Sequence, residues 1–124
     1  MKITLHIVKK DELKDGKRIF EYAEEPIEMN NTIAAQMRFE SCFPELAAKG
    51  SIIDYAERIK GQEGMSLPKT ISALKVIFCF LEKDIPFPKF LKLFDFSQKE
   101  YTDKLIKDLK NAFDVVFDTA AEKN

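Results

Sequence analysis

The N-terminal residues alternate between apolar and other side chains. The apolar positions of this segment are Ile3, Leu5 and Ile7. A period of two is typical of a half-buried strand, so we expect a strand over residues 2–8. Residues 18–23 predict a second strand, with Phe20 and Tyr22 on one face.

The segment between these strands determines the kind of hairpin. Residues 9–17 are polar and contain Asp15-Gly16, which is a turn signal. The pattern predicts an antiparallel hairpin with a long loop, ended by Pro26 because proline cannot donate to a ladder. A hairpin alone is marginal in water, so it must pack on the helices that follow or on a neighbouring subunit.

From residue 31 the pattern becomes helical. Asn30 or Asn31 can cap a first helix, and Pro44 ends or restarts it. Its apolar side is expected to carry Ile33, Met37 and residues 39–43. A second helix over residues 52–60 is expected, with Ser51 as its cap and Gly61 at its end.

A loop over residues 62–67 separates these helices from a more apolar one. Pro68 suits the first turn of a helix that continues over residues 69–83. The apolar run at residues 76–81 widens its buried face, so this should be the central helix. A short helix or turn is expected over residues 89–94.

The last helix is expected from residue 98 to about residue 121. Ser97 and Glu100 have the spacing of a capping box. Apolar residues follow at steps of 4, 4, 3, 1, 3, 1 and 3, and they are Tyr101, Leu105, Leu109, Ala112, Phe113, Val116, Phe117 and Ala120. This stripe predicts one long amphipathic helix.

The sequence predicts a mainly α protein of the α+β class. It combines four to five helices, including the long C-terminal amphipathic helix, with an N-terminal β-hairpin. With 124 residues, the chain should form a single domain over residues 1–124, with the hairpin at 1–25 and a helical body at 31–124.

Composition excludes several classes of function. Hydrophobic residues make up 45% of the chain, which is enough for a core, and the net charge of −1 argues against binding nucleic acid. The six-residue apolar run is too short to span a membrane, and the N-terminus has no signal-peptide pattern. We therefore expect a cytoplasmic protein, with Cys42 and Cys79 as small buried apolar residues.

The residues carry no recognisable catalytic or metal-binding pattern. His6 is the only histidine and is expected on the strand surface, and the four glycines form no phosphate-binding loop. No serine lies in a Gly-x-Ser-x-Gly motif. We expect a protein without enzymatic activity, without a cofactor and without a metal.

Phenylalanine is the unusual residue type, because the chain has eleven and no tryptophan. Most of those in the second half could fill the core, but rings beside the prolines could also form a contact surface. With the apolar side of the first strand, they give the candidate self-association or partner contacts: Ile3, Leu5, Ile7, Phe87, Phe90, Phe94 and Phe96. Replacing Phe90 and Phe94 by Asp should then reduce self-association and leave helicity largely intact.

Three stretches together resemble a known family. They are residues 39–45 with 54–59, residues 76–82 with 90–96, and residues 100–117 with 122–124. Over roughly residues 33–124 the chain resembles the tail assembly chaperones of long-tailed phages and prophages of Gram-positive hosts. The resemblance lies in sizes and aromatic positions, and it carries no catalytic residues.

The resemblance implies a non-enzymatic role in the host cytoplasm. Such proteins bind the tape-measure protein, keep it soluble, help to recruit tail-tube subunits through a longer form, and are absent from the mature virion. They are mainly helical and form homo-oligomers. Many exist as a short form and a longer form made by programmed −1 ribosomal frameshifting.

The C-terminus is compatible with such a frameshift. Glu122-Lys123-Asn124 can be encoded as GAA AAA AAC, which contains the slippery heptamer A-AAA-AAC. Other codons encode the same ordinary polar helix end. Together with the resemblance, this gives the hypothesis that the chain is the short, unshifted product.

Three other readings remain open from the sequence. The first is a small cytoplasmic helical adaptor or regulatory protein unrelated to phage tails, such as an antitoxin. The second is a helical nucleic-acid-binding regulator, which the balanced charge disfavours. The third is an enzyme, which the missing motifs disfavour.

Overall fold

The computed structural model describes residues 1–62, 64 and 66–122. It contains the hairpin strands β1 (Lys2–Lys14) and β2 (Lys17–Glu28). The helices that follow are α1 (Thr32–Cys42), α2 (Pro44–Ala47), α3 (Ile52–Lys60), α4 (Leu67–Phe80), α5 (Phe87–Leu91) and α6 (Lys99–Glu122). This is the expected α+β arrangement, a hairpin followed by helices, and the last helix is the longest.

The hairpin is longer than its hydrophobic pattern predicts. Only Asp15 and Gly16 lie outside the ladder, and both have positive φ angles (52° and 75°), as in a type I′ turn. The expected long loop is therefore wrong. Such a turn matches the twist of the flanking strands, so pairing continues through the charged residues on both sides of it.

Pro26 lies inside β2 and does not end it. His6 pairs with Glu24, yet the His6 N–H bonds to Asp108 instead of to β2. The His6–Glu24 pair is thus a non-hydrogen-bonded pair, and alternation makes Thr4–Pro26 another. A proline is tolerated there because the ladder needs no N–H from it.

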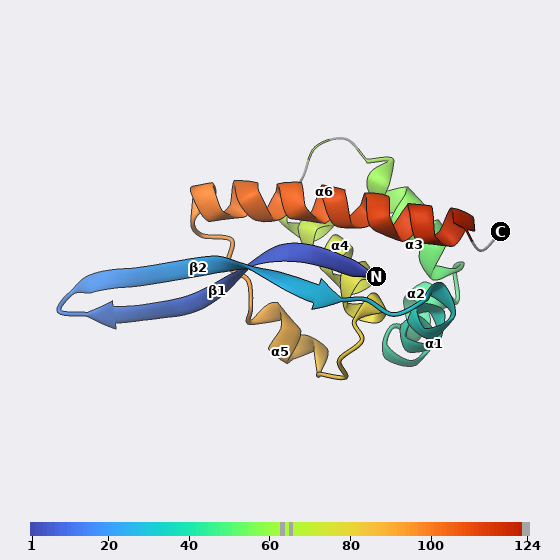
Figure 1. Cartoon of the computed structure of the whole chain (residues 1–124), viewed down its shortest axis with the longest axis horizontal. Helices are drawn as coiled ribbons and strands as arrows, with labels where there is room; N and C mark the ends of the chain where they lie inside the picture. Colours follow the sequence, from blue (N-terminus) through green and yellow to red (C-terminus); the bar gives the residue numbers. More distant parts are fainter. Residues whose placement is uncertain (63, 65, 123–124) are drawn as a thin grey trace.

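A β-bulge marks the place where the hairpin leaves the body. Val8 pairs with Tyr22 and Lys10 pairs with Glu21, so Lys9 is the extra residue. The apolar side chains of β1 before the bulge are buried, and residues 9–18 after it are all exposed. Figure 1 shows this outer part of the hairpin, here called the arm, projecting away from the helices.

Two helices, α1 and α3, begin at the expected caps. Asn31 Oδ1 accepts from the Ala34 N–H at 2.8 Å, and Ser51 forms a full capping box with Asp54. These hydrogen bonds with Ser51 lower the pKa of the Asp54 carboxyl. Ser66 caps α4, with Pro68 in its first turn. The loop expected before α4 includes residues 63 and 65, which lie outside the described residues.

α4 is the central helix, as expected, and eight of its fourteen residues are buried. It ends at Phe80, three residues before the expected end. There Leu81 turns to an extended conformation and forms an isolated bridge with Met29. The chain leaving the hairpin therefore pairs with the chain leaving α4, and this pairing competes with further helix.

α6 buries the expected apolar stripe but lacks the expected capping box. Tyr101, Leu105 and Leu109 are among its buried residues, while the side chain of Ala120 lies outside the described part. The Ser97 hydroxyl donates to Asp95 at 2.8 Å and accepts from Arg18 at 3.0 Å. The hydroxyl is thus committed to these partners, and no bond to the Glu100 N–H is formed.

Polar groups of α6 hold the inner half of β1. Asp108 Oδ2 accepts from the His6 backbone N–H at 2.7 Å and lies 2.6 Å from His6 Nδ1, and the Tyr101 hydroxyl donates to the His6 carbonyl at 2.7 Å. Burial raises the pKa of Tyr101, which keeps this hydroxyl protonated as a donor. The His6 side chain is therefore largely buried, with 14% of it exposed, and the expected surface position is wrong. Its Nε2 atom lies 3.4 Å from Glu24 Oε1.

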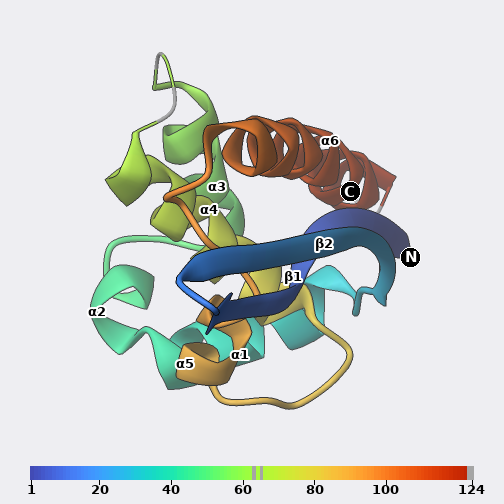
Figure 2. The same ribbon diagram turned by 90° about the vertical axis from the view of Figure 1, so that its left-hand side faces the viewer.

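The hairpin packs on helices of its own chain, which answers a question left open by the sequence. Figure 2 shows it between α6 on one side and α1 and α5 on the other. The Val8 N–H also bonds to the Leu93 carbonyl at 2.9 Å. These hydrogen bonds tie the outer edge of β1 to α6 and to the segment around Leu93.

The two cysteines have different environments. Cys79 is buried in α4, as expected, and burial raises the pKa of its thiol to about 12. Cys42 is exposed at the end of α1, so its expected burial is wrong. Its neighbour Phe43 turns inward and packs beside Phe39 and Phe78, which leaves Cys42 on the outer side.

Removing the Asp108 carboxylate should destabilise the fold. Asp108→Ala leaves the His6 N–H and the His6 ring without their acceptor, which should lower the free energy of unfolding by about 2 kcal/mol. Urea denaturation measures this change. The matched control is Asp103→Ala, an exposed carboxylate on α6, which should change stability by less than about 0.5 kcal/mol. Equal effects of the two substitutions would contradict the role of Asp108.

Candidate interaction surfaces

The seven expected contact residues lie inside the chain or against its core. Ile3, Leu5 and Ile7 are at most 8% exposed, and Phe90 and Phe94 are 1% and 7% exposed. Phe87 and Phe96 are half-buried and pack against the same core. The five buried side chains fill the interior of one subunit, whereas Phe87 and Phe96 keep part of their rings at the surface.

Four phenylalanines of the second half, Phe78, Phe87, Phe90 and Phe94, form a continuous cluster of rings with Phe43. Phe87 contacts Phe43 and Phe78 with centroid distances of 5.2 and 5.1 Å, and Phe90 contacts Phe94 at 5.1 Å. Most of these pairs are edge-to-face or tilted, as favoured by ring quadrupoles. The cluster joins α1, α4 and α5, so the core-filling interpretation of these rings fits the structure.

The exposed apolar side chains lie at other positions. Large apolar residues that are more than half exposed, in the part of the chain that the structure describes, are Leu13, Ile33, Met37 and Leu67. Ile33 and Met37 are 69% and 67% exposed and lie one turn apart on α1. We call this pair the α1 face.

The α1 face arises because α1 is apolar on two sides. Ala35 and Phe39 are fully buried, while Ile33 and Met37 point away from the core. The expectation that Ile33, Met37 and residues 39–43 share one apolar side is therefore wrong. Positions 33 and 37 are separated from positions 35 and 39 by about 200° around a helix, so they belong to opposite faces.

The arm forms a second, charged surface. Arg18 makes two hydrogen bonds of 2.8 Å to Asp11 across the hairpin, which lowers the pKa of that carboxyl. Arg18 also contacts Asp95 at 3.1 Å and therefore links the arm to the segment before α6. Charges along exposed strand edges discourage unspecific pairing with other strands.

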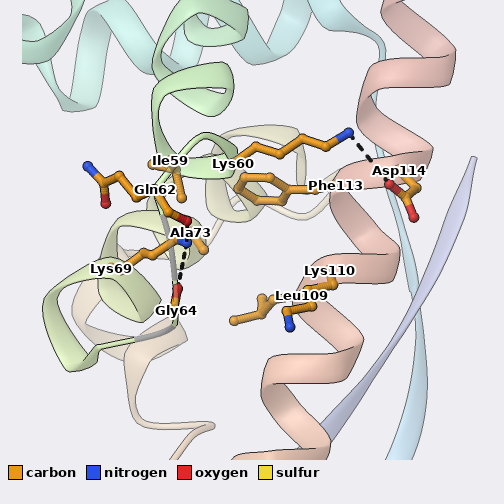
Figure 3. Close-up of a pocket in the computed structure, with 10 residues that line it drawn as sticks. All are labelled: Ile59, Lys60, Gln62, Gly64, Lys69, Ala73, Leu109, Lys110, Phe113 and Asp114. Atoms are coloured by element: carbon orange, nitrogen blue, oxygen red, sulfur yellow. Dashed lines mark hydrogen bonds and ion pairs between the residues drawn. The ribbon is translucent and has the colours of Figure 1, made fainter.

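A pocket of about 360 Å³ lies where α3, α4 and α6 meet. Figure 3 shows its lining, with Phe113 and Leu109 extending from α6 toward the ends of α3 and α4. The apolar lining residues, each at most 5% exposed, are Ile59, Ala73, Leu109 and Phe113. The polar lining residues are Lys60, Gln62, Lys69, Lys110 and Asp114, together with Gly64.

The lysines around this pocket have different partners. Lys69 Nζ donates to the carbonyls of Gln62 and Gly64, the latter at 2.6 Å (Figure 3). Lys60 Nζ lies 3.9 Å from Asp114 Oδ1 and 4.7 Å from the centroid of the Phe117 ring. Lys110 is exposed and makes no ion pair with any residue that the structure describes. The spacing of single residues did not predict this pocket, because it is formed by three separate helices.

Nowhere in residues 1–62, 64 and 66–122 do three or more His, Cys, Asp or Glu side chains gather as metal ligands would. Within the same residues, no helix combines the length and hydrophobicity needed to cross a bilayer.

Comparison with known proteins gives no relative. No family model, no curated protein and no solved structure matches this chain.

Introducing charged side chains should unfold the protein at the buried apolar positions and change its stability little at the exposed ones. Phe90→Asp with Phe94→Asp places two carboxylates in the core and should abolish cooperative unfolding. This reverses the expectation from sequence that helicity would survive. Ile33→Asp with Met37→Asp changes two exposed residues and should alter stability by less than about 1 kcal/mol.

Circular dichroism during heating distinguishes these outcomes. A folded Phe90/Phe94 variant that shows a normal transition would place those rings on the surface. An Ile33/Met37 variant that unfolds would show that the α1 face is packed within the subunit.

Proposed function

We propose that this chain is a tail assembly chaperone of a long-tailed phage or prophage. In this role it binds the tape-measure protein, keeps it soluble during tail assembly and helps to recruit tail-tube subunits. It acts as a homo-oligomer in the cytoplasm of the bacterial host and is absent from the mature virion. The sequence resemblance over roughly residues 33–124 supports this proposal.

The observation that carries the proposal is the α1 face. A tape-measure segment is a long amphipathic helix that must hide its apolar side from water until the tail tube surrounds it. Ile33 and Met37 offer an exposed apolar pair at the i, i+4 spacing that matches one turn of such a helix. The unbranched Met37 side chain adapts to partner residues of different shape.

Two side chains alone make a weak contact, and this fits a chaperone that must later be released. Burying both would contribute about 3–5 kcal/mol before the cost of association is subtracted. Several subunits along one long partner raise the effective concentration of each further contact. Weak single contacts together with tight multiple binding would allow the tube subunits to displace the chaperones one after another.

Co-expression tests the proposed partner and the proposed surface together. The chain is produced with the tape-measure protein encoded beside its gene, and the soluble fraction of the tape-measure protein is measured. The native chain should raise this fraction severalfold, and Ile33→Asp with Met37→Asp should remove most of the gain. Leu13→Asp, which changes an equally exposed apolar residue on the arm, is the matched control and should keep the gain.

Two results would count against this proposal. If the native chain leaves the tape-measure protein insoluble, the chaperone role fails. If the native chain works and the Ile33/Met37 variant works equally well, the role stands and the α1 face is not its surface. A small helical adaptor unrelated to phage tails would give the first result.

The proposed short form of a −1 frameshift pair is tested in the coding DNA. Residues 123 and 124, whose codons would form most of the slippery site, lie outside the described residues. Sequencing codons 122–124 and the bases beyond should show A-AAA-AAC and an open −1 frame that continues past the stop codon. Other codons with a closed −1 frame would remove the frameshift and leave the α1 argument unchanged.

A further inference from the structure

The pocket between α3, α4 and α6 shares no residue with the α1 face. It combines an apolar interior with a rim whose described charged residues are three lysines and one aspartate, in a chain whose overall charge is −1. A ligand that has both an apolar group and negative charge would complement these two features. We propose that the pocket is a second docking site, which binds a protein segment that presents one bulky apolar side chain flanked by carboxylates.

The charge balance of the rim favours an acidic ligand. Among the lining residues that the structure describes, three are lysines and one is a carboxylate, so their summed charge is +2. The Asp114 carboxylate is 3.9 Å from Lys60, a distance that leaves both groups largely available to solvent or to a ligand. Lys69 covers two loop carbonyls beyond the end of α3, which removes nearby negative potential. Lys110 is the rim lysine that makes neither an ion pair nor a side-chain hydrogen bond with the residues that the structure describes.

The apolar interior sets the size of the inserted group. Leu109 and Phe113 on α6 face Ile59 and Ala73 across the hollow (Figure 3). A volume of about 360 Å³ lies at the lower end of the roughly 300–1,000 Å³ found for small-ligand sites. It accommodates one or two side chains and excludes a whole helix. The rest of the segment would therefore lie across the rim, where its carboxylates reach Lys60 and Lys110.

Such a site goes beyond the proposed function and does not depend on it. The α1 face is neutral and apolar, so it suits many amphipathic helices and discriminates little among them. The pocket adds selection by charge, because a basic segment would meet lysines at the rim. Opposite charges at a rim chiefly raise the rate of association and exclude wrong partners.

Selection from a displayed library of random twelve-residue peptides tests this site directly. Peptides enriched on the native chain should share a Phe, Leu, Met or Trp with Asp or Glu within four positions. Lys110→Glu should weaken their binding about three- to tenfold, and added salt should weaken it as well. Lys107→Glu, an equal charge reversal on an exposed lysine of α6 outside the pocket, should leave binding unchanged.

A second variant separates the pocket from the general charge of α6. Ala73→Leu adds bulk to the pocket wall and should reduce binding of the same peptides, with circular dichroism as the check that the fold is kept. The proposal is overturned if no peptide is enriched, if the enriched peptides lack acidic residues, or if Lys110→Glu binds them as well as Lys107→Glu does. None of these results depends on the tape-measure protein.

Discussion

The contact of His6 with Asp108 and Tyr101 joins the first element of the fold to the last. It spans about 100 residues of sequence and uses the backbone N–H, the backbone carbonyl and the ring of His6. A two-stranded hairpin is marginal by itself, and a helix of 24 residues needs a partner for its apolar stripe. The hairpin and α6 stabilise each other by packing together. α4 is enclosed between them and the remaining helices.

This contact also determines which parts of the chain stay outside. α6 and the segment around Leu93 hold β1 only as far as Val8. Beyond the bulge at Lys9 the hairpin projects as the charged arm, which Phe20 and Arg18 of β2 still connect to Tyr101 and Asp95. On the helical side, α1 uses Ala35 and Phe39 to reach the core, and this leaves Ile33 and Met37 on the outside. The proposed function rests on this division between a closed core and exposed, unpartnered elements.

Local sequence signals predicted much of the fold. Caps such as Asn31 and Ser51, and the Asp15-Gly16 turn, act through hydrogen bonds or dihedral angles of a few neighbouring residues, so they can be recognised without a structure. The length of the arm could not be predicted, because its strands carry no alternating apolar pattern and depend on the turn and on cross-strand pairs. The end of α4 depends on pairing between Leu81 and Met29, which are distant in sequence.

The interaction surfaces were harder to predict than the fold. Phenylalanines beside prolines are equally consistent with core and surface, and only their packing with Phe43 and Phe78 decides for the core. Ile33 and Met37 fit a buried stripe until the position of Phe39 fixes the inner face of α1.

The most direct test is methyl NMR of the chain with and without purified tape-measure protein. The account predicts shifts or line broadening at the methyl groups of Ile33 and Met37, while those of Leu13 on the arm stay unchanged. Unchanged signals from Ile33 and Met37 in the presence of bound partner would contradict it.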